Sequence, residues 1–159
     1  MKEVVFLIGG NLGDRLNYLE RTRNRLAMEF EWVDSSRIFE TSPWGGQSEG
    51  LFLNQAILVR TTFSADQVLE IIQKIEKEMG RKRVLRWGNR TMDIDIIFFG
   101  QEIINDPHLT IPHKSMAERR FVLEPLCDLI PDFVHPILGL KVSALLEECK
   151  DDAQVHPIF

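Results

Sequence analysis

The sequence predicts an α+β fold, a ferredoxin-like αβα sandwich with a mainly antiparallel sheet. The elements expected along the chain follow the order strand, helix, strand, strand, helix, strand, which is the split βαβ arrangement of that fold. The expected first strand is a continuous apolar run, as a buried central strand requires. A length of 159 residues fits one domain, so residues 1–159 are expected to form a single unit.

The first half of the chain supplies three strands and a helix. Gly9 and Gly10 are expected to end the first strand, and Asp14 is placed to cap the helix that follows. A loop rich in Gly, Ser and Pro separates the second strand from the third. The expected ranges are strand 4–8, helix 15–30, strand 32–40, loop 41–50 and strand 53–61.

The second half begins with the clearest helix. Ser64 and Gln67 form a capping-box pattern, and Gly80 is a suitable stop. A second capping-box pattern at residues 115–118 predicts a short helix that Pro125 limits. The other expected elements are a loop at 81–91, a strand at 92–99, a short strand at 102–104 and a final helix at 142–148.

Composition narrows the class of protein. A net charge of −5 argues against a general nucleic-acid binder, because such a protein needs a basic surface. No apolar run approaches the ~20 residues that cross a bilayer. Cys127 and Cys149 fit no metal-ligand spacing and are expected to be reduced thiols. We therefore expect a cytoplasmic monomer that has small-molecule partners and binds neither nucleic acid nor membrane.

An acidic pair in the strand at 92–99 is the first candidate for chemistry. Asp93 and Asp95 share one face, with Cα atoms about 7 Å apart. Like charges this close repel, and two Mg²⁺ ions bound to substrate phosphates would compensate them. The alternative is a solvated pair, which is the default for an isolated Asp-X-Asp pattern. The opposite face is expected to carry the core residues Met92, Ile94, Ile96 and Phe98.

The loop before this strand is strongly basic. Arginine side chains match phosphate oxygens, so the loop is suited to neutralise a polyphosphate. Trp87 and Gly88 suit a loop that closes on its ligand. The alternative is a solvated basic loop that touches RNA. The five cations are Arg81, Lys82, Arg83, Arg86 and Arg90.

Residues 86–96, Arg-Trp-Gly-Asn-Arg-Thr-Met-Asp-Ile-Asp-Ile, resemble the signature of the 6-hydroxymethyl-7,8-dihydropterin pyrophosphokinase family (2-amino-4-hydroxy-6-hydroxymethyldihydropteridine diphosphokinases) of folate synthesis. The resemblance covers nearly the whole chain in the family's order. It includes residues 9–15, 40–45, 52–56, 111–113, 119–126 and 134–136.

This resemblance implies a Mg²⁺-dependent enzyme that transfers pyrophosphate from ATP to the hydroxymethyl group of a reduced pterin, giving AMP. It implies that Asp93 and Asp95 bind two Mg²⁺ ions and take part in catalysis. Arg81 and Arg90 are similar to catalytic, phosphate-neutralising residues, and Trp87 to a loop residue that helps close the site. The residues implied on the ATP side are Gln73, Glu76, Ile96, His113 and Arg119.

The resemblance also implies a pterin pocket. A flat heteroaromatic ring gains from aromatic faces on both sides and needs an amide-like partner at its edge. Phe52 and Phe121 match the stacking pair, and Asn54 matches the residue at the ring edge. Asn54 and Gln55 alternate along a strand, so one of them is expected to face solvent. Backbone groups around Thr41, Ser42 and Trp44 are implied at the other ring atoms.

Three positions depart from the family pattern: Gly10, Asn89 and Lys114. They affect the expected affinity and loop kinetics, not the activity. No side-chain general base is assigned from the sequence. One rival is another Asp-X-Asp, metal-dependent transferase that uses a nucleotide, which leaves Phe52 and Phe121 without a shared purpose. The other is a ferredoxin-like RNA-binding module, which predicts a basic sheet face.

Overall fold

The computed structural model of the chain describes residues 1–41, 51–80 and 92–158. Its main sheet is built from β1 (Lys2–Gly10), β2 (Glu31–Ser35), β3 (Phe39–Thr41), β4 (Phe52–Thr61), β5 (Asp93–Phe99) and β8 (Val155–Pro157). The strands lie in the order β5-β1-β4-β3-β8, and β2 pairs with β4. All pairings among the described residues are antiparallel, which confirms the predicted sheet.

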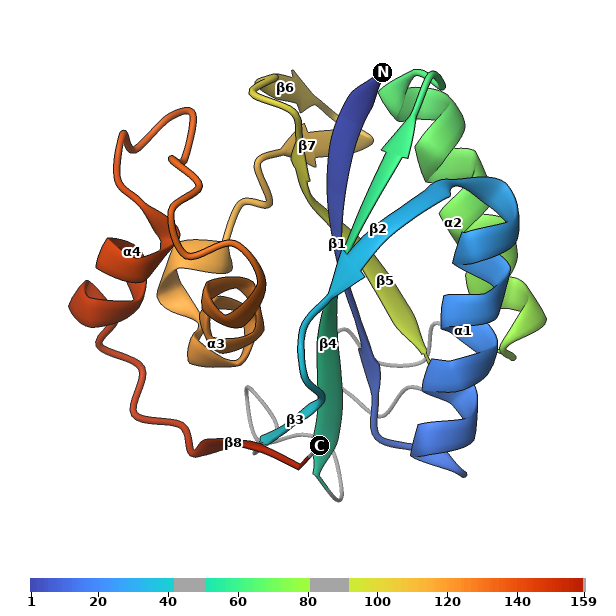
Figure 1. The fold of residues 1–159 in the computed structure, drawn as a ribbon, viewed down its shortest axis with the longest axis horizontal. Coiled ribbons are helices and arrows are strands. Elements are labelled where there is room, and N and C mark those ends of the chain that lie inside the picture. The colour runs from blue at the N-terminus through green and yellow to red at the C-terminus, as the bar shows by residue number, and fades with distance from the viewer. Residues whose placement is uncertain (42–50, 81–91, 159) are drawn as a thin grey trace.

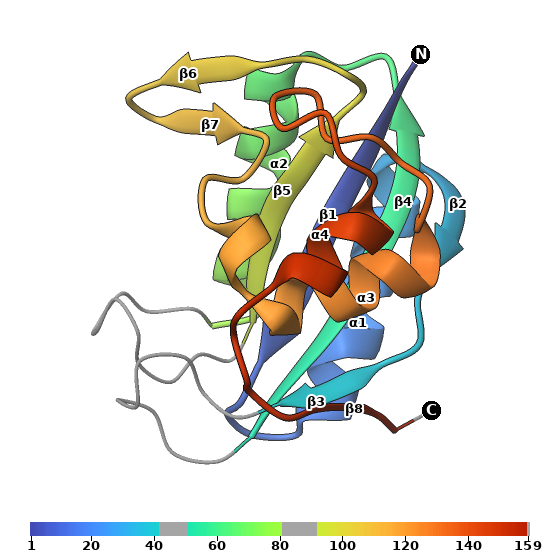
Figure 2. The same cartoon turned by 90° about the vertical axis from the view of Figure 1, so that its left-hand side faces the viewer.

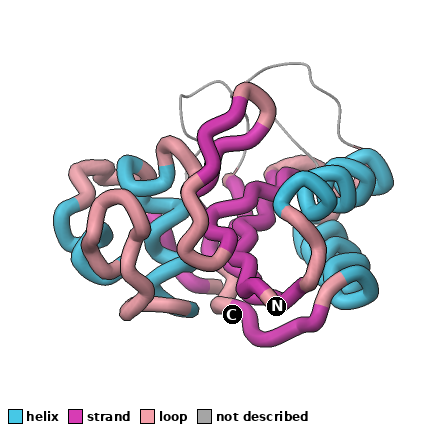
Figure 3. The backbone as a smooth tube through the Cα atoms, turned by 90° about the horizontal axis from the view of Figure 1, so that it is seen from above, coloured by secondary structure: helices cyan, strands magenta, loops and turns pink. Residues whose placement is uncertain are grey.

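Helices cover both faces of the sheet (Figures 1 and 3). They are α1 (Arg15–Glu29) and α2 (Ala65–Glu78) on one face, and α3 (Arg120–Leu129) and α4 (Val142–Glu148) on the other. Alternate residues of β1 serve the two faces. Val4 and Phe6 pack with α1 and α2, whereas Val5 and Leu7 pack with α3 and α4. The predicted αβα sandwich is therefore confirmed.

Both N-terminal helix caps agree with the sequence. The Asn17 backbone N–H donates to Asp14 Oδ1 at 3.1 Å, at the start of α1. Ser64 and Gln67 form the reciprocal capping box of α2, with hydrogen bonds of 2.9 and 3.2 Å. Both caps involve residues three positions apart in the chain, so they depend little on the tertiary structure.

The helix prediction after residue 115 was wrong in two respects. Ser115 makes no side-chain cap, and residues Met116–Glu118 form a 3-10 turn, η2. The helix α3 starts at Arg120 and contains Pro125 in its interior. Proline removes a helical hydrogen bond there. Burial of the neighbouring Leu123 and Leu126, both 0% exposed, offsets that loss.

The predicted strand at 32–40 is two strands, because Ser36 interrupts the ladder. The Ala56 N–H donates to the Ser36 hydroxyl at 2.9 Å, where regular pairing would use a backbone carbonyl. The predicted strand at 102–104 was also wrong. The chain there forms a hairpin of β6 (Ile104–Asp106) and β7 (Leu109–Ile111), outside the main sheet. Strand β8 was not predicted.

A register shift in β5 changes which face its last residues occupy. Phe6 pairs with Ile96 while Val5 pairs with Phe98, so Ile97 is an extra residue in the ladder. Phe98 therefore packs against α3 and α4, and the prediction that it shares the face of Ile96 was wrong. None of the described helices is long and apolar enough to span a membrane.

Candidate functional site

The two aspartates lie near the start of β5, on the face covered by α3 and α4. Asp93 pairs with Gly9 and Asp95 with Leu7, whose side chain belongs to the core of that face. Both carboxylates are half-buried. The intervening Ile94 is 4% exposed and packs on the other face, so the predicted alternation is confirmed.

Asn54 lies in the same row of the sheet as Asp93. Gly9 of β1 pairs with Asp93 of β5 on one side and with Asn54 of β4 on the other. Neighbouring strands are about 4.8 Å apart, which puts the Asp93 and Asn54 backbones about 10 Å apart. A side chain on Gly9 would collide with Asn54 Oδ1 and with the Leu53 carbonyl, so glycine is needed for the Asn54 amide to lie close over β1 in this row.

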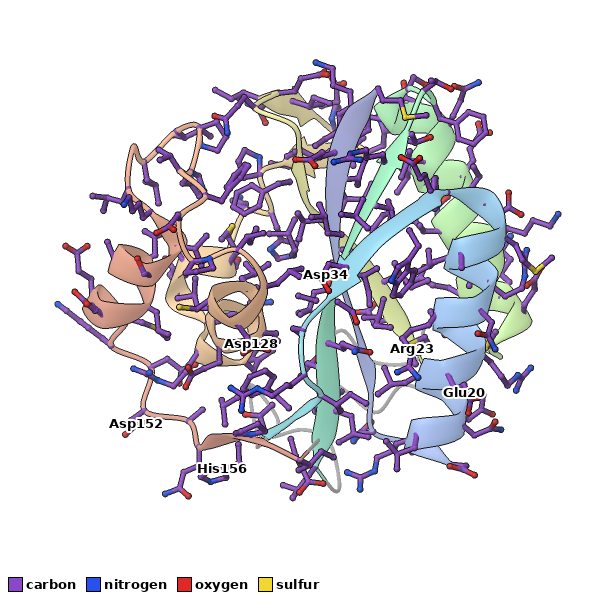
Figure 4. The ribbon with its side chains drawn as sticks, in the orientation of Figure 1. Glu20, Arg23, Asp34, Asp128, Asp152 and His156 are labelled. Carbon is purple, nitrogen blue, oxygen red and sulfur yellow. The ribbon has the colours of Figure 1, made fainter. Side chains whose placement is uncertain are left out.

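The Asn54 amide is buried, at 5% exposure, and its Nδ2 has no hydrogen-bond partner among the described residues. A buried, unsatisfied donor is costly unless a ligand completes it. Gln55, on the opposite face, is also 5% exposed and bonds the Ser36 carbonyl at 2.7 Å and Arg23 at 3.0 Å. The expectation that one of Asn54 and Gln55 faces solvent was therefore wrong. Figure 4 shows Arg23 between α1 and the sheet.

His113 and Arg119 approach the aspartates from the segment before α3. Burial lowers the pKa of His113, and the cationic Arg119 lowers it further, while the Asp93 carboxylate acts in the opposite direction. The Ser115 N–H donates to His113 Nδ1 at 3.3 Å, so the neutral ring carries its proton on Nε2. His113 is held to β5 by a 3.1 Å bond from its N–H to the Ile97 carbonyl.

Glu76 contacts the same strand from α2. It is 7% exposed, and its carboxylate accepts a 2.8 Å hydrogen bond from the Ile94 N–H. Gln73, one turn earlier, is exposed. The Ile96 side chain is 6% exposed and lies in the core of α1 and α2, so only its backbone could face a nucleotide.

The expected aromatic pair comes from two elements. Phe52, at the start of β4, is half-buried and pairs with Thr41, at the end of β3. Phe121 is the second residue of α3 and is also half-buried. The Arg119 guanidinium lies 5.9 Å from the centre of the Phe121 ring. Thr41 is 2% exposed, and its hydroxyl donates to the Gln154 carbonyl at 3.1 Å.

Several predicted site residues lie outside the described residues, and their roles stay predictions. They are Ser42, Trp44, Arg81, Trp87 and Arg90. Within the described part of the chain, no cluster of three or more His, Cys, Asp or Glu side chains forms a potential metal site.

Two residues important to this geometry were missed in the sequence. Gly9 was interpreted only as the end of a strand, although its place between Asp93 and Asn54 needs the absence of a side chain. Arg15 donates to Glu40 Oε2 at 2.8 Å and to the Leu51 carbonyl at 3.0 Å, so it joins the chain on both sides of residues 42–50. No local sequence pattern predicts these hydrogen bonds of Arg15, because its partners are distant in the sequence.

Comparison with known proteins places the chain in a family. A sequence model described as 7,8-dihydro-6-hydroxymethylpterin-pyrophosphokinase (HPPK) matches residues 5–131. A 2-amino-4-hydroxy-6-hydroxymethyldihydropteridine pyrophosphokinase of Bacillus subtilis is 39% identical over 134 residues, covering 81% of this chain and 79% of that protein. The protein of the same name from Aquifex aeolicus is 35% identical over 137 residues, 86% of each chain.

Longer proteins are also similar. The folic acid synthesis protein fol1 of Pneumocystis carinii is 36% identical over 159 residues, which is 99% of this chain but 21% of fol1. A crystal structure of Plasmodium falciparum HPPK-DHPS with SDX-DHP has a TM-score of 0.75 over 92% of this chain and 44% of that one. Its identity of 16% makes this a likeness of fold. On the sequence matches, the chain belongs to the 7,8-dihydro-6-hydroxymethylpterin-pyrophosphokinase family.

Proposed function

We propose that Asp93 and Asp95 hold two Mg²⁺ ions in the family's reaction, the transfer of a pyrophosphoryl group from ATP to 6-hydroxymethyl-7,8-dihydropterin in folate synthesis. The observation that carries this proposal is the row formed by Asp93, Gly9 and Asn54. It offers a carboxylate for the metal at one end and, at the other, the Asn54 amide, which lies over the glycine and is suited to bind a heterocycle. A pterin bound at Asn54 directs its substituent towards the aspartates.

The donor set fits magnesium. Two half-buried carboxylates, spaced by two strand residues, provide hard oxygen ligands and leave positions for phosphate oxygens and water. When bound there, Mg²⁺ neutralises phosphate charge and lowers the pKa of the substrate hydroxyl. The neutral His113 offers its Nε2–H to a phosphate oxygen, and Arg119 beside it adds a positive charge.

The pterin is held by the remaining residues of the site. The unpaired Asn54 Nδ2 donates to an acceptor on the ring edge. Phe52 and Phe121 offer ring faces from β4 and α3 for stacking. Backbone groups at residues 41, 42 and 44 complete the ring edge.

In the reaction, the hydroxyl oxygen of the substrate attacks the β-phosphorus of ATP. A bond forms between that oxygen and the β-phosphorus, and the bond from the β-phosphorus to the bridging α–β oxygen breaks, so AMP leaves. The hydroxyl proton passes to solvent, since no side chain is assigned as general base. Arg81 and Arg90 neutralise the phosphates, Trp87 helps close the loop, and Gln73 and Glu76 lie on the ATP side. Most of the catalysis comes from positioning and charge stabilisation.

One assay tests the proposal directly. The chain is incubated with ATP, Mg²⁺ and 6-hydroxymethyl-7,8-dihydropterin, and the nucleotide products are separated. AMP and the pterin diphosphate are expected in equal amounts, and chelation of Mg²⁺ by EDTA is expected to stop their formation. Release of ADP alone would reject pyrophosphoryl transfer and would favour another metal-dependent transferase that uses a nucleotide.

The finer properties of the protein belong to the same proposal. We expect a cytoplasmic monomer, in keeping with the net charge of −5 and the free thiols of Cys127 and Cys149. Size-exclusion chromatography with light scattering checks the oligomeric state against the chain mass of 18.4 kDa.

A further inference from the structure

The segment Cys149–Pro157, called the C-terminal segment below, joins two parts of the proposed pterin pocket. It leaves the end of α4, passes the start of α3 and enters the main sheet as β8 (Figures 1 and 2). The family match ends at residue 131, so the segment lies beyond the part of the chain that the family description covers.

Its first attachment is at the start of α3. The N–H of Arg120, the first residue of that helix, donates to Asp151 Oδ2 at 2.9 Å. The Arg120 side chain returns two bonds, from Nε to the Asp151 carbonyl at 2.8 Å and from Nη2 to the Cys149 carbonyl at 3.3 Å. Residue 119 makes no side-chain cap, so Asp151 caps α3 from a distance of 31 residues.

The Asp151 carboxylate is itself oriented. Its second oxygen accepts a 3.0 Å bond from the Ala153 N–H, so both oxygens have backbone partners. The residue that follows Arg120 is Phe121, one of the two rings proposed to stack on the pterin. The position of that ring therefore depends on how the segment holds the first turn of α3.

The second attachment is at the end of β3. Thr41 pairs with Val155 across the β3–β8 ladder, and the Thr41 hydroxyl donates to the Gln154 carbonyl at 3.1 Å. Thr41 in turn pairs with Phe52, the other proposed stacking residue. One short stretch of chain is thus bonded directly to Thr41 and Arg120, each of which adjoins or pairs with a stacking ring.

We propose that the C-terminal segment positions the two walls of the pterin pocket relative to each other, with Asp151 as its main positioning residue. The segment has no part in the chemistry of phosphate transfer. Its effect is on the spacing between Phe121 and Phe52, and therefore on the affinity for the pterin. This inference rests on the proposed function, because it assumes that these two rings bind the substrate.

The test compares Asp151→Ala with Asp152→Ala. Asp152 is the adjacent residue, is exposed, and points away from the body of the protein in Figure 4. Asp151→Ala is expected to raise the KM for the pterin about tenfold, the factor associated with loss of a hydrogen bond to a charged group. The kcat and the KM for ATP are expected to stay within about twofold of wild type, as is every constant of Asp152→Ala.

Two further measurements keep the test decisive. Asp151→Asn keeps the side-chain shape but only one of the two acceptor oxygens, so it is expected to raise the pterin KM by a smaller factor than Asp151→Ala. If Asp151→Ala does not fold, this smaller rise, with kcat and the KM for ATP unchanged, is the expected result, and a pterin KM equal to that of Asp152→Ala overturns the proposal. The affinity for the pterin, measured without turnover by titration calorimetry, is expected to fall by the same factor as the KM for the pterin rises.

Equal constants for the Asp151 and Asp152 variants would overturn the proposal. A lower kcat together with a higher KM for both substrates would also overturn it, since that pattern indicates general damage to the protein. Failure of wild type and Asp152→Ala to form AMP would instead reject the proposed function itself.

Discussion

The carboxylate of Glu76 on α2 accepts a 2.8 Å hydrogen bond from the backbone N–H of Ile94 on β5. Ile94 is the residue between the two aspartates, and β5 is at the edge of the main sheet formed by the described strands, so its outward N–H groups have no partner among those strands. Glu76 therefore secures the backbone that carries the pair proposed to bind metal. The Glu76 carboxylate thus accepts the hydrogen bond that a backbone carbonyl of a neighbouring strand accepts elsewhere in the sheet.

Replacement of Glu76 by alanine is expected to weaken both fold and turnover. The Ile94 N–H loses its charged partner in a buried place, which costs about 1–3 kcal/mol of unfolding free energy. Glu76→Gln keeps an acceptor oxygen and is expected to lose less. Urea denaturation and AMP formation measure the two effects.

Glu78→Ala is the matched control for this prediction. Glu78 lies on the same helix and also accepts a hydrogen bond, from Arg25 Nε at 2.7 Å, but it is exposed to solvent. A smaller stability change and normal turnover are expected. Equal loss of stability in Glu76→Ala and Glu78→Ala would show that the contact with Ile94 is unimportant.

Replacement of Asp95 by asparagine is expected to separate activity from stability. Turnover should fall by about a hundredfold to a thousandfold, because charge stabilisation worth several kcal/mol is lost. The unfolding free energy should change little, because asparagine keeps the side-chain shape and an acceptor oxygen at this half-buried position. Asp34→Asn, on the exposed side of β2, is the control and should retain full turnover (Figure 4). Undiminished AMP formation by Asp95→Asn would remove the metal role.

Replacement of Asn54 and replacement of the adjacent Gln55 should have different effects, the first on pterin binding and the second on stability. Asn54→Ala is expected to raise the KM for the pterin about tenfold with little change in stability, because Nδ2 bonds no other described residue. Gln55→Ala leaves the Ser36 carbonyl and the Arg23 guanidinium without their partner and should cost about 1–3 kcal/mol. Steady-state kinetics and thermal unfolding distinguish them; a stability loss confined to Asn54→Ala would contradict the assignment.

His135 should make the fold sensitive to acid. Burial lowers its pKa from 6.5, and its Nδ1 accepts N–H groups from Ile137 and Leu138, both at 3.1 Å. His135 therefore binds a proton more readily in the unfolded chain than in the folded one. The free energy of unfolding is highest above about pH 6.5 and decreases as the pH falls below that value. Unfolding by urea at pH 7.5 and 5.5 measures the loss.

His135→Asn, whose side-chain oxygen can accept the same two N–H groups, should reduce the pH dependence. His156→Asn, on the exposed strand β8, is the control and should leave that dependence as in wild type (Figure 4). An unchanged pH profile in His135→Asn would exclude His135 as the source.

Local patterns predicted the elements that depend on near neighbours in the chain. The Asp14 cap and the Ser64–Gln67 capping box agree with the structure, since each involves residues three positions apart. Predictions failed where distant partners intervene. Ser36 breaks a strand by bonding Ala56, and Pro125 is accommodated in a helix that packs on the sheet.

The sequence by itself determined the class of fold, the alternation of Asp93 and Asp95 with buried isoleucines, and the family motifs. Period along one strand is sufficient for the alternation, the order of the elements predicts the class of fold, and the motifs rest on resemblance to the family. Only the tertiary structure decided that Asp93 and Asn54 share one row across Gly9, and that Asp151 caps a helix 31 residues earlier. Strand register and long-range capping depend on which segments pack together, and no local pattern in the chain specifies that choice.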